Sequence, residues 1–160
     1  MKDIRLLLIL AGCAVLGLTA LAHDKSAPLN DEQKAFLSQY EAVRAALAAD
    51  DLAATKKAAA IIATEPKTPP KEPLTPEQMD RQAKFATTVK TIATADSLST
   101  ARDAFKVLSK RAVHYAGGKE GFYVANCPMV KDGEGDWVQT SKKISNPYFG
   151  KSMLTCGSIK

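Results

Sequence analysis

Five prolines fall within the eleven residues from 66 to 76, in the stretch "TEPKTPPKEPLTPEQ". Proline lacks a backbone N–H and clashes with the preceding helical turn, so no helix can run through this stretch. A helical hairpin before it would bury little apolar surface by itself. We therefore expect an extended connector over about residues 64–76 inside one domain, with helices on both sides.

The sequence before the connector predicts two helices. Asn30 or Asp31 can cap the first helix, whose apolar residues recur at spacings of three and four. They are Phe36, Tyr40, Val43 and Leu47. Asp50 or Asp51 begins a second helix that runs to about Thr64. Its candidate inward residues are Leu52, Ala59 and Ile62.

Two further helices are predicted after the connector. Thr75 supplies a hydroxyl cap, with proline at the first helical position and Gln78 three residues after the cap. The face expected to be buried carries Met79, Ala83, Ala86, Val89 and Ala93. The fourth helix starts at Asp96 or Ser97 and ends at Gly117-Gly118. Its apolar residues are Leu98, Ala101, Phe105, Leu108, Ala112 and Tyr115.

After Gly121 the pattern changes from helical to strand-like. "FYVANCPMV" and "WVQT" have the aromatic and β-branched residues of strands, and "KDGEGD" between them is typical of a turn. The segment "KSMLTCGSI" is ambiguous. We therefore predict a mainly α protein: an antiparallel four-helix bundle with a short β-hairpin or irregular cap at residues 121–160. Residues 23–160 would form one domain.

The N-terminus has the pattern of an export signal. A short basic opening precedes about fifteen apolar residues and then small residues, which favours cleavage after Ala22 and a signal peptide over residues 1–22. "LAGC" also resembles a lipobox, in which Cys13 would carry a lipid anchor. Both alternatives place the protein outside the cytoplasm, in the periplasm, and only the second attaches it to a membrane.

Each of the two cysteines beyond the leader lies close to a methionine. Cys127 is two residues before Met129, and Met153 is three residues before Cys156. Two thiolates and two thioethers form a soft ligand set, which selects Cu(I) or Ag(I) over hard cations. His114, at the end of the fourth helix, is a weaker candidate for a further ligand. Pro128 and Asn146-Pro147 are expected to fix the backbone beside the cysteines.

A disulfide is the alternative interpretation of the same residues. An exported protein with two thiols commonly joins them, and a Cys127–Cys156 bridge would stabilise the fold by about 3–4 kcal/mol in the chain-entropy model. The methionines would then be ordinary packing residues. In that case the protein is a structural or interaction module that binds no metal.

Other function classes have little support in the sequence. The net charge of +5 is spread along the chain, and no basic run marks a nucleic-acid surface. There is no serine or cysteine triad, no glycine-rich phosphate loop and no prominent carboxylate pair, so we do not expect an enzyme.

The segments "YVANCPM", "DWVQ", "NPYFGKSMLTCG" and "ARDAFKVLSKRAV" resemble an exported bacterial family, domain of unknown function 3347. The resemblance extends over the mature chain and is strongest from Tyr123 to Gly157. Members of that family occur alone or fused to periplasmic adaptor subunits of copper/silver efflux pumps. The resemblance therefore implies a heavy-metal role, with Cys127, Met129, Met153 and Cys156 as ligands and an efflux adaptor as partner.

Overall fold

The structure, a computed structural model, describes residues 27–64, 69–70 and 72–160. The predicted signal peptide, with Cys13 and the cleavage site at Ala22, lies outside the described residues, as does part of the proline-rich connector. Within the described part of the chain, none of the helices has the length and apolar character required to cross a membrane.

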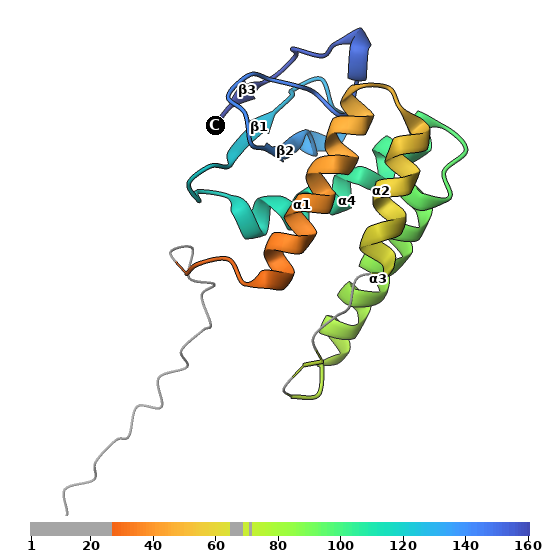
Figure 1. The fold of residues 1–160 in the computed structure, drawn as a ribbon, viewed down its shortest axis with the longest axis vertical. Coiled ribbons are helices and arrows are strands. Elements are labelled where there is room, and N and C mark those ends of the chain that lie inside the picture. The colour runs from red at the N-terminus through yellow and green to blue at the C-terminus, as the bar shows by residue number, and fades with distance from the viewer. Residues whose placement is uncertain (1–26, 65–68, 71) are drawn as a thin grey trace, which may run out of the picture.

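Four helices pack in the order of the sequence, each against the next (Figure 1). They are α1 (Asp31–Ala48), α2 (Leu52–Thr64), α3 (Pro76–Ala93) and α4 (Leu98–Ala116). The first three lie side by side, and α4 runs across them toward the C-terminal part of the chain. The predicted mainly α class is confirmed.

The helix starts agree with the predicted capping residues. The Asn30 and Thr75 side chains accept hydrogen bonds from the backbone N–H groups of Gln33 and Gln78, whose own side chains bond back to complete capping boxes. Ser97 accepts a hydrogen bond from the N–H of Thr100 and so begins α4. These contacts satisfy backbone donors that have no partner within the helix.

The buried face predicted for α3 is largely wrong. Met79, Ala83 and Ala86 are exposed, and only Val89 of the predicted set is fully buried. The face that packs inward instead carries Phe85, Thr88, Val89 and Ile92. Burying the Phe85 ring, which meets the Phe36 ring edge-on at 5.9 Å, removes far more apolar surface from water than burying alanines does.

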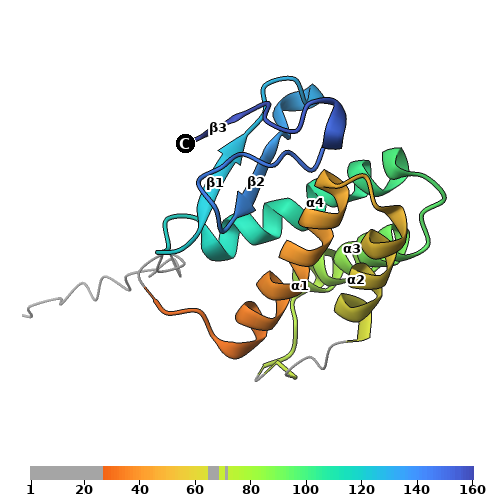
Figure 2. The same ribbon diagram turned by 45° about the horizontal axis from the view of Figure 1, so that its top comes forward.

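The C-terminal residues 121–160, called the cap from here on, form a three-stranded antiparallel sheet. Strand β1 (Tyr123–Asn126) lies between β2 (Asp136–Gln139) and β3 (Ser158–Ile159). The predicted hairpin is confirmed, with Val124 opposite Val138. The ambiguous end of the chain supplies the third strand, because Ser158 pairs with Asn126. Figure 2 shows the sheet beside α4 and α1, away from α2 and α3.

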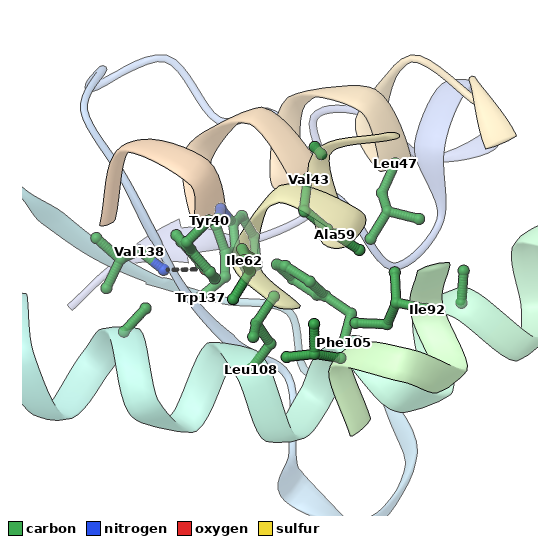
Figure 3. Close-up of a cluster of buried hydrophobic side chains, with 14 of the residues drawn as sticks. Tyr40, Val43, Leu47, Ala59, Ile62, Ile92, Phe105, Leu108, Trp137 and Val138 are labelled. Carbon is green, nitrogen blue, oxygen red and sulfur yellow. Dashed lines mark hydrogen bonds between the residues drawn. The ribbon is translucent and has the colours of Figure 1, made fainter. Parts of the chain in front are cut away.

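One hydrophobic core includes residues of both the helices and the cap (Figure 3). The Tyr40 ring of α1 stacks on the Phe105 ring of α4 at 5.3 Å. Phe105 in turn meets the ring of Tyr148, a cap residue, at 5.7 Å. Trp137 of β2 is fully buried beside them. The cap is therefore fixed on the helices by side-chain packing as well as by chain connection.

Candidate metal centre

The structure brings the two cysteines of the cap together. Cys127 directly follows β1, and Cys156 directly precedes Gly157 and β3, so pairing of the two strands places both at the same end of the sheet. Both residues are free thiols, and their sulfur atoms are 3.0 Å apart. Cys127 is buried and Cys156 is half-buried, so one side of the pair is accessible to solvent.

Each cysteine shares a four-residue turn with a methionine. The backbone N–H of Val130 donates to the Cys127 carbonyl at 3.3 Å, which closes a turn that contains Pro128 and Met129. Proline is favoured at the second position of such a turn because its φ angle is already fixed there. The N–H of Cys156 donates to the Met153 carbonyl at 3.0 Å and closes the second turn. The two Cys/Met pairs of the sequence therefore correspond to two facing turns.

Glycine at position 157 allows the second turn to approach the sheet. Its φ angle is +128°, a conformation that residues with a side chain rarely adopt. A Cβ atom there would lie 2.8 Å from the Asn126 carbonyl oxygen and 2.8 Å from the Trp137 ring. Only glycine can therefore follow Cys156 at this distance from β1.

The two methionines differ in their surroundings. Met129 has 59% of its surface exposed. It lines a hollow of about 330 Å³ between α4 and the cap, together with Arg102, Lys106, Lys131 and Phe149. Met153 is half-buried. Among the described residues, the two cysteine sulfurs contact each other, and the methionine sulfurs take no part in this contact.

His114, the weaker candidate, lies in the last turn of α4. It is exposed and lines a hollow with Val124, Asp136 and Lys160, and its ring is 5.7 Å from that of Tyr115. Within the residues that the structure describes, no three His, Cys, Asp or Glu side chains gather around one point. His114 is therefore not placed together with the two cysteines.

The thiol contact changes the acid–base behaviour of Cys156. Its hydrogen bond with Cys127, followed by partial burial and the nearby Cys127 charge, raises the pKa of the Cys156 thiol. The protonated form is favoured mainly because it keeps this hydrogen bond, and to a smaller extent because a second thiolate at this distance would be repelled. A soft cation between the sulfurs would remove that repulsion and displace the proton.

Two arginines that bind the cap were not recognised as such in the sequence. Arg44 of α1 donates to the Ser145 carbonyl at 2.8 Å, and Arg102 of α4 donates to the Pro147 carbonyl at 3.0 Å. For Arg44, its position in the sequence could have indicated this contact. Arg44 lies between Val43 and Leu47 on the apolar face of α1, where a cation needs partners from another segment.

Comparison with known proteins identifies one family. The sequence model of the family described as "Protein of unknown function (DUF3347)" matches residues 36–119, which is more than half of the chain. The chain therefore belongs to this family. The match extends from within α1 to just beyond α4 and ends before Tyr123, so the Cys/Met turns lie outside it. No curated protein and no solved structure matched the chain.

Proposed function

We propose that this member of the DUF3347 family is an exported protein that binds Cu(I) or Ag(I) through Cys127 and Cys156. The observation that carries the proposal is the contact of the two thiols, 3.0 Å apart, at a partly accessible end of the sheet. The protein would buffer the ion in the periplasm or deliver it to an adaptor subunit of a copper/silver efflux pump.

The chemistry of the pair favours a soft ion. Thiolates prefer Cu(I) and related soft metals, whereas Mg²⁺ and Ca²⁺ require oxygen ligands. Two thiolates at about 2.3 Å from one ion, the length of a zinc–sulfur bond, stand roughly 4 Å apart. Since the two sulfur atoms are 3.0 Å apart, they need to separate by only about 1 Å to admit an ion.

The methionines would have different roles in this site. Met153 shares its turn with Cys156 and is the candidate third ligand. Met129 is exposed beside a hollow lined by three cationic side chains and the Asp103 carboxylate, and we assign it to the entry and release of the ion. Thioethers are neutral, so they bind a soft cation less tightly than thiolates do. Because the cations outnumber this carboxylate, a metal donor or acceptor with an acidic surface would fit the hollow.

Titration of the reduced protein with Ag(I) against a competing chelator tests the proposal. Replacing both cysteines (Cys127→Ser with Cys156→Ser) should reduce the affinity by more than the about 10- to 100-fold that changes outside the ligand set cause. Met153→Leu should cause a smaller loss, and His114→Gln should cause none. Equal, weak binding by the wild type and the double serine variant would contradict the proposal.

The raised pKa of Cys156 predicts how binding depends on pH. The metal displaces the thiol proton, so the apparent affinity for Ag(I) should increase as pH rises toward the pKa of this thiol. Proton release measured during the titration should account for both thiols. A pH-independent affinity would show that the thiols are not the ligands.

A disulfide between the same residues is the second candidate, and the short sulfur–sulfur distance favours it as well. It would close a loop from residue 127 to 156 and stabilise the protein by about 3–4 kcal/mol. The protein would then be a structural or interaction module. Protein isolated from the periplasm without reductant would contain no free thiol, and its melting temperature would fall on reduction. A thiol count together with metal analysis separates the two candidates.

A further inference from the structure

We infer that Asn146 is the positioning residue of the thiol pair. Its side chain holds the loop that carries Cys156, and so it sets how readily the two thiols form a disulfide or bind one ion. The part of this inference that concerns metal affinity rests on the proposed function. The part that concerns the reactivity of the two thiols with each other does not.

Asn146 is fully buried and all of its polar groups are bound. Its side-chain N–H donates to the Cys156 carbonyl at 2.8 Å. Its side-chain oxygen accepts the backbone N–H groups of Tyr148 at 2.8 Å and Phe149 at 3.3 Å. Its own N–H donates to the Leu154 carbonyl at 2.8 Å. One residue thus ties together the beginning and the end of the loop from 146 to 156.

The residues on both sides of Asn146 are bound to the helices. Arg44 of α1 donates to the Ser145 carbonyl, and Arg102 of α4 donates to the Pro147 carbonyl. Arg102 is itself fixed by the Asp50 carboxylate and the Leu47 carbonyl at the end of α1. Asn146 therefore has a defined position relative to the helices. Its hydrogen bond to the Cys156 carbonyl fixes the position of Cys156 as well.

Cys127 is positioned by other contacts. Its N–H donates to the Gly135 carbonyl at 3.0 Å, and the residue follows β1 directly. A loss of the Asn146 contact would thus move one thiol and leave the other in place. The effective concentration of one thiol at the other would fall, because the 146–156 loop would sample positions away from Cys127.

The test is the Asn146→Asp variant of the full chain in glutathione buffers. Aspartate keeps the oxygen that accepts from Tyr148 and Phe149, but in its ionised form it cannot donate to the Cys156 carbonyl. In the reaction measured, the two protein thiols become a disulfide and give two electrons and two protons to glutathione disulfide, which becomes two glutathione thiols. We expect the equilibrium constant for oxidation to fall about fivefold, which corresponds to about 20 mV for a two-electron couple.

Gln139→Glu is the matched control. Gln139 is also a buried cap amide, and its side-chain nitrogen donates to the Ser141 and Lys143 carbonyls, not to a cysteine. The substitution removes the same kind of donor from the same part of the molecule. It should lower the melting temperature and leave the oxidation constant within about twofold of wild type.

A second variant keeps the test valid if Asn146→Asp does not fold. Arg44→Met removes the donor to the Ser145 carbonyl and retains an apolar stem, and it should shift the oxidation constant in the same direction by a smaller factor. An unchanged oxidation constant in Asn146→Asp, or in Arg44→Met where only that variant folds, would overturn the inference. So would an equal shift in Gln139→Glu.

Titration of the same variants with Ag(I) separates this inference from the proposed function. If wild type binds Ag(I), Asn146→Asp should bind it about fivefold more weakly, in proportion to the oxidation constant. If wild type does not bind Ag(I) while Asn146→Asp still shifts the oxidation constant, the proposed function fails and the positioning role stands. If wild type binds Ag(I) and the variant changes neither quantity, only the positioning role fails.

Discussion

The helices and the cap are held together by different kinds of contact. Among the helices, the buried residues are mainly apolar side chains that recur every three or four positions. In the cap, buried amide side chains bind backbone groups of irregular segments. Gln139 binds three such groups, the Ser145 N–H at 3.3 Å and the Ser141 and Lys143 carbonyls, and it also accepts from the Trp137 indole N–H at 2.8 Å. Asn146 does the same for the following loop.

This difference has a consequence for where a site can be placed. A helix face tolerates many substitutions because each apolar residue contributes a share of a common interface. A loop fixed by a few buried hydrogen bonds depends on single residues, since an unpaired buried donor costs about 1–3 kcal/mol. The thiol pair lies in the second kind of region. The family match lies on the first kind, residues 36–119.

The largest effect is expected where both regions meet. Phe105 is fully buried and its ring contacts Tyr40 of α1 and Tyr148 of the cap. Phe105→Ala should lower the free energy of unfolding by about 3–5 kcal/mol, because it removes apolar contacts and leaves a cavity. Urea denaturation followed by circular dichroism and by Trp137 fluorescence measures both regions at once.

In this variant the two probes should report one coincident transition, since the core is shared. Val107→Ala on the exposed side of the same helix, where 38% of the side chain is accessible, should change stability by less than about 0.5 kcal/mol. Separate transitions for the helices and the tryptophan would contradict a common core.

A smaller effect is expected from a polar contact between the regions. Tyr40 is buried, and its hydroxyl accepts the backbone N–H of Val138 in β2 at 3.0 Å. The Ser109 hydroxyl donates its proton to the Asp136 carbonyl at 2.8 Å. In the contact between the two hydroxyl groups, at 3.1 Å, Tyr40 is therefore the donor and Ser109 the acceptor. Burial raises the pKa of Tyr40, which keeps this donor protonated.

Tyr40→Phe should therefore cost about 1–2 kcal/mol, because the Val138 N–H loses its acceptor. Hydrogen exchange should show the loss of protection mainly in β2. Tyr123→Phe is the control, since the Tyr123 hydroxyl makes no hydrogen bond within the described residues. An equal loss in both variants would assign the effect to packing instead.

The two regions also differ in how well the sequence predicts them. Capping residues and apolar spacing gave the four helices with their ends, because both signals act within a few residues of each other. The error on α3 arose because its alanines and Met79 have helical spacing too, and only the competition with Phe85 and Ile92 decides which face is buried. That competition depends on the neighbouring helices.

For the cap, the sequence predicted the hairpin and the proximity of two Cys/Met pairs, but not the contacts that arrange them. Gln139 and Arg44 read as ordinary polar residues until their backbone partners are known. Those partners lie in segments without regular spacing. The pairing of β3 with β1 that places Cys156 beside Cys127 was not predicted, because β3 has only two residues, Ser158 and Ile159.

A change inside the helical region should leave the cap unaffected. Thr75→Ala removes the side-chain acceptor at the start of α3 and should cost about 1 kcal/mol. The reactivity of the thiols toward a disulfide reagent in the folded protein should stay at the wild-type rate. Thr87→Ala on the exposed face of the same helix should be neutral or slightly stabilising, because alanine is the better helix former. A faster thiol reaction in Thr75→Ala would show that α3 supports the site.

The smallest effect is expected at the Asp50–Arg102 ion pair, through which the helices contact the cap. Asp50 has a positive φ of 59°, pairs with Arg102 and accepts the Lys151 N–H of the cap at 3.1 Å. The Arg102 hydrogen bond, only partly opposed by burial, lowers the pKa of Asp50.

A lowered pKa in the folded protein gives stability that is complete above the unfolded value of about 3.9 and is lost as pH falls through the folded value. Asp50→Asn, which tolerates the same backbone conformation, should thus be less stable than wild type by under about 1 kcal/mol at pH 7, and the gap should close as pH falls through the pKa of Asp50 in the folded protein. Urea denaturation at a series of pH values below 7 measures this, with Asp103→Asn, at an exposed carboxylate that pairs with Lys106, as control. A gap that stays the same over the whole series would mean that the Asp50 charge does not hold the cap to the helices.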